Sequence, residues 1–198
     1  MFLIESKLLH QLEQWDRWLF IQVNNNEVNP FFDSLMPYLR NAYTWAPLYL
    51  FLLIFVTINF KGRGWWWVVL FLCTVSLTDM VSSKVCKEAF ERLRPCQDPD
   101  FIEHVRLLVN RCGTGYSFTS SHAANHFGVA SFIFLTMRKV FKSRIWLFYL
   151  WAAAVSYSQV YVGVHYPFDV LGGAFIGLAF GLLLGTFFNK RFSFVTFD

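Results

Sequence analysis

Residues 145–168 read IWLFYLWAAAVSYSQVYVGVHYPF, and after Asp169 residues 170–189 continue as VLGGAFIGLAFGLLLGTFFN. Neither stretch contains Lys, Arg, Asp or Glu, and each is long enough for a membrane-spanning helix, which needs about 20 mostly apolar residues. Further windows without charge lie at 41–60, 64–78 and 112–137, and the second of these reaches span length only by continuing past Asp79. Together the windows predict five membrane-spanning helices, at roughly 43–60, 65–83, 121–138, 145–163 and 169–188.

The composition of the whole chain agrees with this reading. Of the 198 residues, 56% are hydrophobic, 20% are aromatic and 15% are charged. Soluble domains carry about 25% charged residues, and a soluble core of this size cannot bury so much apolar surface. Disordered chains, coiled coils and small disulfide scaffolds are therefore excluded, and we predict an all-α integral membrane protein. No zinc-binding spacing, nucleotide-binding glycine pattern or nucleic-acid footprint is evident, so no cofactor, metal or nucleic acid is expected.

The N-terminal residues 1–26 have a different pattern from the spans. Apolar residues recur there at helical spacing with charged residues between them, at Leu8, Leu12, Trp15, Leu19 and Val23. This pattern predicts an amphipathic helix lying in the membrane interface, with a sixth short span as the alternative. The scattered charges exclude a signal peptide. Residues 27–198 are then expected to form the membrane domain.

The distribution of basic residues predicts the orientation. The connections after the first, third and fifth spans carry positive charge, at Lys61, Arg63, Arg138, Lys139, Lys142, Arg144, Lys190 and Arg191. Short loops rich in Lys and Arg stay in the cytoplasm. The long connection 84–120 and the C-terminal end of the fourth span are therefore expected to face outward.

Three clusters of polar residues gather at these outward ends. The first holds Lys87 and Arg94-Pro95, whose spacing of two helical turns puts both side chains on one helix face. The second is SFTSSH at 117–122, in which hydroxyl groups precede a helix and, with its free N–H groups, can bind an anion. The third runs from Ser158-Gln159 to His165 and Asp169. Each alone is compatible with an ordinary solvated base, cap or local hydrogen bond, but three on one side predict a functional site.

The residue types suit phosphoryl transfer without a metal. A histidine can act as nucleophile and form a phosphohistidine. A neighbouring carboxylate fixes its tautomer and stabilises the developing cation, and a second histidine protonates the leaving oxygen and then activates water. Lys, Arg, hydroxyls and N–H groups at a helix start hold the phosphate oxygens.

With this pattern the sequence resembles the type-2 phosphatidic acid phosphatase superfamily, which also includes vanadium haloperoxidases. The family's first motif, Lys, six residues and Arg-Pro, matches Lys87 to Pro95, and its second, Pro-Ser-Gly-His, aligns with residues 119–122. The third, Ser-Arg, five residues, His, three residues and Asp, aligns with residues 158–169. The resemblance implies His165 as nucleophile, Asp169 as its partner and His122 as general acid. It implies phosphate binding by Lys87, Arg94, Ser120, Ser121 and Gln159, with Ser158 supporting the third motif.

The sequence departs from the family pattern in its second and third motifs. Thr119 and Ser121 replace the proline and the glycine of the second motif. Gln159 replaces an arginine that clamps the phosphate, and an amide supplies N–H donors but no charge. We expect another cation of the outward loop to supply it, and prefer Arg111 to Arg92 because Arg111 lies beyond the helix face of the first motif.

Several other residues have more than one interpretation. Asp79 is either a partner of Lys84 or Lys87 or an ordinary buried carboxylate. His126 lies one turn past His122, a spacing that can bind zinc, but no third ligand is evident. Cys96 and Cys112 share the outward loop, where a disulfide between them is possible. The glycines at 172, 173, 177, 181 and 185 are typical of close helix packing.

The leading functional hypothesis is a hydrolase that removes phosphate from a membrane lipid on the outward face of the bacterial cell (inner) membrane. By resemblance the first substrate to consider is undecaprenyl diphosphate, with lipid A, phosphatidylglycerophosphate and phosphatidate as rivals. A catalytically silent lipid-binding or flipping relative is a different reading, to which Gln159 would point as a sign of decay. A transporter is disfavoured because, apart from Asp79, the spans carry no charge. The oligomeric state is left open.

Overall fold

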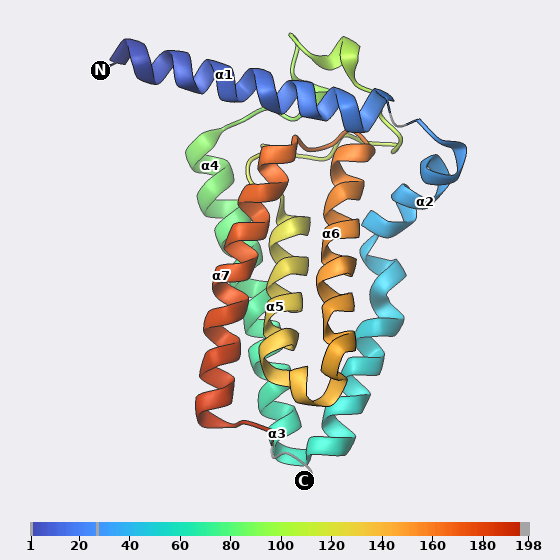
Figure 1. The fold of residues 1–198 in the computed structure, drawn as a ribbon, viewed down its shortest axis with the longest axis vertical. Coiled ribbons are helices and arrows are strands. Elements are labelled where there is room, and N and C mark those ends of the chain that lie inside the picture. Colours follow the sequence, from blue (N-terminus) through green and yellow to red (C-terminus); the bar gives the residue numbers. More distant parts are fainter. Residues whose placement is uncertain (1, 27, 195–198) are drawn as a thin grey trace.

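A computed structural model describes residues 2–26 and 28–194, with the side chains defined from residue 7. In these residues the chain forms helices and no strands, so the all-α prediction is confirmed. The α-helices are α1 (Phe2–Ile21), α2 (Pro30–Arg40), α3 (Ala46–Met80), α4 (Lys87–Phe90), α5 (Ser121–Phe141), α6 (Trp146–Tyr161) and α7 (Pro167–Arg191). Figure 1 shows α3, α5, α6 and α7 as an upright bundle with α1 across one end. The expected domain limits at 27 and 198 fall on residues outside those described.

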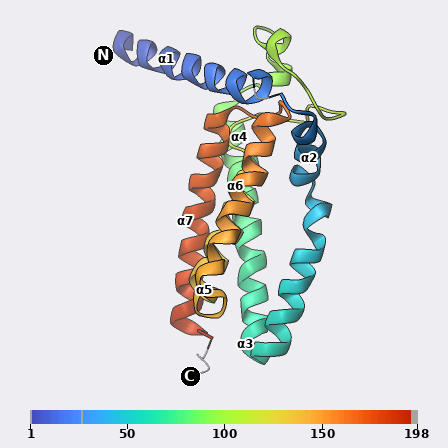
Figure 2. The ribbon, with the colours of Figure 1, turned by 45° about the vertical axis from the view of Figure 1, so that its right-hand side comes forward.

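Helix α3 contains the first two predicted spans as the two arms of a hairpin. Its backbone leaves helical geometry at Lys61, with φ 49° and ψ −124°, and Figures 1 and 2 show the chain reversing there. Gly64 lets the arms approach closely, because a Cβ at this position would overlap the backbone carbonyl of Val56. The turn between α5 and α6 is similar, since Lys142 has φ 50° and ψ −129°. Both turns lie at the same end of the bundle (Figure 1).

Within the described residues, two segments are long and apolar enough to cross a membrane, Ala42–Phe90 and Pro167–Arg191. The first includes both arms of α3, and the second corresponds to the fifth predicted span. Helices α5 and α6 lie where the third and fourth spans were predicted. The total of five spans remains a prediction.

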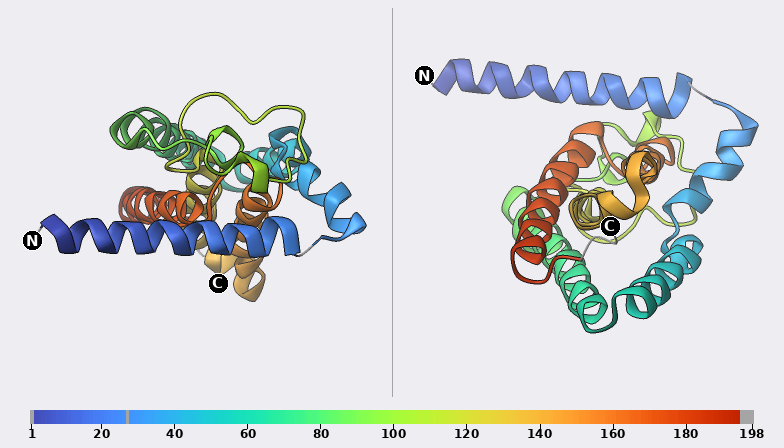
Figure 3. Two further views of the ribbon diagram at one scale, coloured as in Figure 1. Left: turned by 90° about the horizontal axis from the view of Figure 1, so that it is seen from above. Right: turned by 60° about the horizontal axis from the view of Figure 1, so that its bottom comes forward.

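The core of the bundle forms around α5, which lies between α7, α6 and α3 (Figure 3). Its buried side chains include Phe132, Ile133 and Met137, which pack in one cluster with Trp67 of α3 and Phe188 of α7. The indole of Trp67 donates to Thr136 Oγ1 at 2.8 Å, so the buried polar atom has a partner.

A line of glycines on α7 allows α5 to approach without intervening side chains. A Cβ at Gly173, Gly177 or Gly181 would overlap the backbone carbonyl of Ser120, Ala124 or Gly128, respectively. The predicted role of these glycines in helix packing is confirmed. The contact also joins the starts of the two helices, where the Ser120 N–H donates to the Asp169 carbonyl at 2.9 Å.

Helix α1 lies across the end of the bundle that holds the polar clusters (Figures 1 and 3). Leu8, Trp15 and Leu19 are exposed, whereas Asp16 and Phe20 are completely buried against the bundle. The predicted amphipathic helix therefore exists, α-helical to Ile21 and continued by a π-helical turn, Gln22–Asn26. Its place in a membrane interface remains a prediction.

Replacing Gly177 by Ala should destabilise the bundle by about 1–3 kcal/mol, the usual effect of overpacking. The new methyl group meets the Ala124 carbonyl, and the backbones of α5 and α7 must separate. Thermal unfolding of the purified protein in detergent measures the effect. Gly62→Ala is the matched control because its Cβ would have open space around it. Equal unfolding temperatures for the two variants would contradict the packing account.

Candidate active site

The turn between α6 and α7 brings His165 and Asp169 together. Tyr166 is the N-cap of α7 and Pro167 its first residue, an arrangement that starts the helix within one turn of Asp169. The Asp169 carboxylate accepts the Tyr166 N–H at 2.8 Å, which fixes its orientation. Its Oδ2 lies 3.6 Å from His165 Nδ1 and accepts the Ser117 hydroxyl at 2.5 Å. Ser117 Oγ itself lies 3.3 Å from His165 Nδ1, so both oxygens face this nitrogen.

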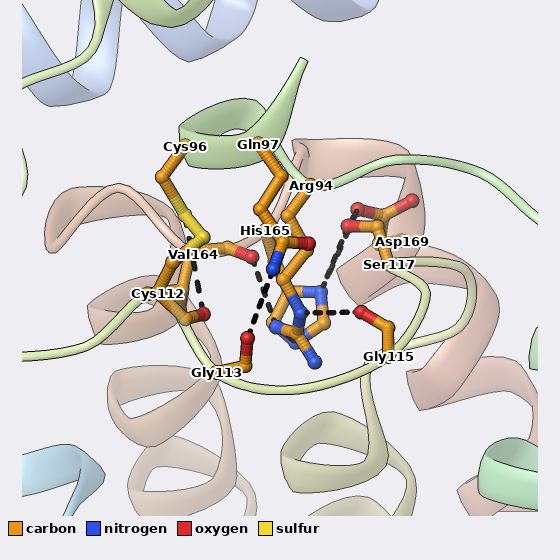
Figure 4. The surroundings of a disulfide bond; sticks show 10 residues. All are labelled: Arg94, Cys96, Gln97, Cys112, Gly113, Gly115, Ser117, Val164, His165 and Asp169. Carbon is orange, nitrogen blue, oxygen red and sulfur yellow. Dashed lines mark hydrogen bonds and ion pairs between the residues drawn. A yellow bond between two sulfur atoms is a disulfide. The ribbon is translucent and has the colours of Figure 1, made fainter.

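Arg94 occupies the other side of the imidazole (Figure 4). Its Nη1 lies 3.0 Å from His165 Nε2 and 3.1 Å from the Val164 carbonyl, while Nε donates to the Gly115 carbonyl at 3.1 Å. A guanidinium can only donate, so Nε2 is the acceptor and the proton belongs on Nδ1. The lone pair of Nε2 therefore points at a cation. A phosphate oxygen that enters the site can take over the same N–H group.

The loop around Arg94 is closed by a disulfide between Cys96 and Cys112, whose Cα atoms are 5.9 Å apart (Figure 4). Beside the disulfide, Gly113 has φ +94° and a Cβ there would lie 3.4 Å from Arg94 Cζ. Glycine suits both the positive φ and the close guanidinium. The loop thus holds the first motif against the segment that leads to the second.

Burial sets the charge state of His165, which is only 2% exposed. The loss of solvation lowers its pKa to about 4, although hydrogen bonding and attraction from Asp169 act in the opposite direction. At neutral pH the imidazole is therefore uncharged, the form that a nucleophile requires.

A second arginine connects this pair to the N-terminal helix. Arg92 donates from Nη1 to Asp169 Oδ1 at 2.8 Å and from Nη2 to Asp16 Oδ2 at 2.6 Å. Asp16 also accepts the Phe168 N–H at 2.8 Å. Burial raises the pKa of Asp16 to about 6 in spite of Arg92. Burial alone would lower the pKa of Arg92, but attraction from the two carboxylates outweighs it and raises this pKa.

The second motif begins α5 beside the pair. Ser120 is the N-cap and its Oγ accepts the Ala123 N–H at 3.5 Å, while Ser121 Oγ accepts the Ser82 hydroxyl at 2.8 Å. His122 lines a cavity of about 450 Å³ that Arg40 also lines. The charge of Lys87 acts on the His122 imidazole. The structure therefore gathers His122, His165, Asp169, Lys87 and Arg94 in one site.

Two residues of the third motif point elsewhere. The Ser158 hydroxyl donates to the Val155 carbonyl at 2.6 Å. The Gln159 amide makes a long contact of 3.4 Å to the same carbonyl, and its Oε1 is buried without a partner among the described residues. Gln159 is fully buried in the bundle. The amide is thus turned back along its own helix.

Asp79 and Arg111 lie outside the centre of the site. Asp79 is exposed and accepts from Asn125 Nδ2 at 3.3 Å, so the buried-carboxylate interpretation is wrong, whereas its charge does act on Lys87. Arg111 is exposed, and the described part of the chain offers it no hydrogen bond or ion pair.

Asp16 and Arg40 were not predicted as site residues, and Ser117 was predicted only as a hydroxyl of the second polar cluster, not as a partner of Asp169. Asp16 counted only as one of the scattered N-terminal charges. The sequence feature that could have identified it is Phe20, one turn later, because Phe20 is buried on the same helix face.

Metal independence also stays a prediction. The described residues hold no group of three His, Cys, Asp or Glu side chains suited to a metal ion.

The site and the fold together define the class of protein. The sequence profile of the PAP2 superfamily matches residues 64–193, and the chain belongs to this superfamily. It is 34% identical over 151 residues to a lipid A 4'-phosphatase of Bacteroides thetaiotaomicron, covering 75% of this chain and, at 66%, just under two thirds of that relative. It is 33% identical over 165 residues to an undecaprenyl-diphosphatase of Sulfolobus acidocaldarius, covering 80% of this chain and 71% of that relative.

A solved structure has the same fold. It is the crystal structure of a transmembrane PAP2-type phosphatidylglycerolphosphate phosphatase from Bacillus subtilis, with a TM-score of 0.70 and 24% identity. The similarity covers 100% of this chain and 95% of that one. The helical arrangement in Figures 1 to 3 is therefore that of a PAP2 membrane protein.

The His165 imidazole should stay neutral from pH 8 down to about pH 5, because its pKa is lowered from 6.5 to about 4. The unfolded chain takes up this proton first, so His165 should also weaken folding as the pH falls from 6.5 toward 4. Nitrogen-15 NMR of histidine-labelled protein in nanodiscs measures the titration, and the signal absent from His165→Gln is the one to follow. Protonation near pH 6.5 would contradict the effect of burial.

Proposed function

We propose that this chain is a membrane lipid phosphatase that works through a phosphohistidine at His165. One observation carries the proposal. The buried, neutral imidazole has a carboxylate and a hydroxyl at Nδ1 and a guanidinium at Nε2, an arrangement that makes Nε2 a nucleophile beside an anion-binding group.

In the first step Nε2 of His165 attacks phosphorus and the bond from phosphorus to the leaving oxygen breaks. Asp169 stabilises the positive charge that develops on the ring, and Arg92 and Ser117 hold Asp169 in place. His122 donates a proton to the leaving oxygen. Arg94, Lys87 and the first N–H groups of α5 neutralise the phosphate oxygens.

In the second step water hydrolyses the phosphohistidine. Having lost its proton, His122 accepts one from the water, whose oxygen attacks phosphorus and releases His165 with inorganic phosphate. The same residue thus acts first as acid and then as base. Because Nδ1 keeps its proton through both steps, the contacts to Asp169 and Ser117 are needed throughout.

The substrate we propose is a phosphate or diphosphate carried by a membrane lipid. One relative is named for lipid A and another for undecaprenyl diphosphate, at similar identity, and both substrates belong in the first panel. An apolar cavity of about 490 Å³ between α3 and α6, lined by Trp45, Leu48 and Trp151, suits a hydrocarbon chain. Trp151, on the wall of this cavity, packs against His126 of α5, with ring centroids 4.7 Å apart.

We further propose a multi-pass protein of the bacterial inner membrane with the site on the periplasmic side. The turns at Lys61 and Lys142 and the end of α7 lie at the end of the bundle opposite the site (Figure 1). Their basic residues favour the cytoplasm for this end.

His165→Ala should abolish phosphate release, because the other described side chains offer no equivalent nucleophile. His122→Ala should slow it by about two to four orders of magnitude, the usual range for the loss of a general acid. Phosphate release from purified lipid A, undecaprenyl diphosphate, phosphatidylglycerophosphate and phosphatidate measures both effects, with His104→Ala as the control at an exposed histidine. EDTA should leave the rate unchanged and vanadate should inhibit. Normal turnover in His165→Ala would refute the mechanism.

The orientation predicts where an impermeant thiol reagent reacts in intact cells. In a background with Cys73→Ser and Cys86→Ser, a cysteine at Asp100 should be labelled and one at Gly62 should not, since the two positions lie at opposite ends of the bundle. Permeabilised cells supply the control, in which both should react. Labelling at position 62 alone in intact cells would reverse the orientation.

A further inference from the structure

A cation from α2 reaches the site that the three motifs form. Arg40 is the last residue of α2, and it lines the cavity of about 450 Å³ that His122 also lines. Its side chain is half-buried, and the Nε atom is buried without a hydrogen-bond partner among the described residues. A buried donor without a partner costs free energy unless a ligand satisfies it.

Neighbouring contacts fix the position of Arg40. Asn29 caps the start of α2 with a hydrogen bond of 2.8 Å to the Phe31 N–H. Asp33 of the same helix binds Arg106 at 2.7 Å and the Tyr161 hydroxyl at 2.7 Å, which holds α2 against α6. At the other end the Trp45 indole donates to the Leu39 carbonyl at 2.8 Å. Arg40 is therefore held at the cavity by a helix that is anchored at both ends.

The charge of Arg40 lacks a carboxylate partner. Three other arginines near this end of the bundle each have one: Arg17 binds Asp98, Arg92 binds Asp16 and Asp169, and Arg106 binds Asp33. Arg94 has no carboxylate partner among the described residues, but two backbone carbonyls and His165 accept its N–H groups. Arg40 forms no such pair in the part of the chain that the structure describes. Its charge acts instead on two other groups of the site, Arg94 and His122. An uncompensated cation among such groups favours a bound anion.

The other candidates for the charge that Gln159 lacks are engaged with carboxylates or exposed. Gln159 is buried and turned toward Val155, Arg92 bridges two carboxylates, and Arg111 is exposed. Arg40 is the remaining cation that faces the cavity beside His122 among the described residues.

We propose that Arg40 binds the phosphate group of the substrate next to His122 and supplies the positive charge that the family's arginine provides in the third motif. The inference rests on the proposed phosphatase function and adds a residue from outside the three motifs. The guanidinium donates to a phosphate oxygen on the side of the leaving group, while Arg94 donates from the side of His165. The phosphate is then held between two arginines from different parts of the chain.

The test compares Arg40→Gln, Arg40→Lys and the control Arg111→Gln, all as full-length protein in detergent. Orthovanadate affinity is measured by calorimetry. The value of kcat/KM is measured with the lipid of the panel from which wild type releases phosphate fastest. A hydrogen bond between charged groups contributes enough for Arg40→Gln to lower both by about 10- to 100-fold. Arg40→Lys, which keeps the charge but loses the fork of donors, should fall between Arg40→Gln and wild type. Arg111→Gln should stay within about twofold of wild type.

The outcomes separate the two proposals. If wild type releases phosphate and binds vanadate but Arg40→Gln binds it equally well, the role of Arg40 is overturned and the phosphatase function stands. An equal loss in Arg111→Gln would also overturn it, because the missing charge would then come from the outward loop. If wild type neither binds vanadate nor releases phosphate from any lipid, the phosphatase function itself fails. The unfolding temperature of each variant shows whether a loss of vanadate affinity or of kcat/KM reflects unfolding. If Arg40→Gln is unfolded, the comparison of Arg40→Lys with wild type tests the role of Arg40.

Discussion

The site depends on one buried carboxylate, that of Asp169. Its oxygens accept hydrogen bonds from the Tyr166 backbone, Ser117 and Arg92, and one of them faces His165. Its backbone carbonyl accepts the N–H of Ser120, the residue that caps α5. A carboxylate without solvent is stable only when such donors surround it. Asp169 therefore fixes the connection between α4 and α5, the starts of α5 and α7 and, through Arg92, the N-terminal helix relative to one another.

The close contact between α5 and α7 makes this arrangement possible. Because glycines at 173, 177 and 181 leave room for the backbone of α5, Ser120 comes within hydrogen-bonding distance of Asp169. A membrane-spanning helix has little hydrophobic driving force for association in lipid, so packing of this kind has to hold the bundle together. The geometry of the site is thus set by small residues that themselves take no part in its chemistry.

The sequence predicted the helical fold and grouped Lys87, Arg94, His122, His165 and Asp169, which the structure brings together. Ser158, Gln159, Asp79 and Arg111 were predicted with them but lie elsewhere. The success had a local reason. Runs without charge identify spans, and the motif residues sit at fixed spacings within short segments of the chain, as Lys87 and Arg94 or His165 and Asp169 do. The shared helix face expected for Lys87 and Arg94 is wrong, because α4 ends at Phe90 and Glu91 has a left-handed backbone. Asp16 and Arg40 were not predicted because their positions beside the site depend on how α1 and α2 fold back over the bundle, which no local pattern encodes. Arg111 was preferred to Arg92 as the source of the charge that Gln159 lacks. That preference relied on position along the chain, which does not determine distance in the folded protein. In space Arg92 bridges two carboxylates, Arg111 is exposed, and the cation beside His122 comes from α2.

Lys61 and Lys142 show a compromise between the fold and the membrane. Each has a positive φ, near 50°, that glycine adopts at lower free energy, and such a backbone conformation costs about 1–3 kcal/mol. A glycine does occur in this turn, but it is Gly62, whereas the positive φ falls on Lys61. Exchanging either lysine for glycine would relax its turn but remove a positive charge from the end proposed to stay in the cytoplasm. In that orientation, the two turns give up conformational stability to keep the protein inserted the right way round.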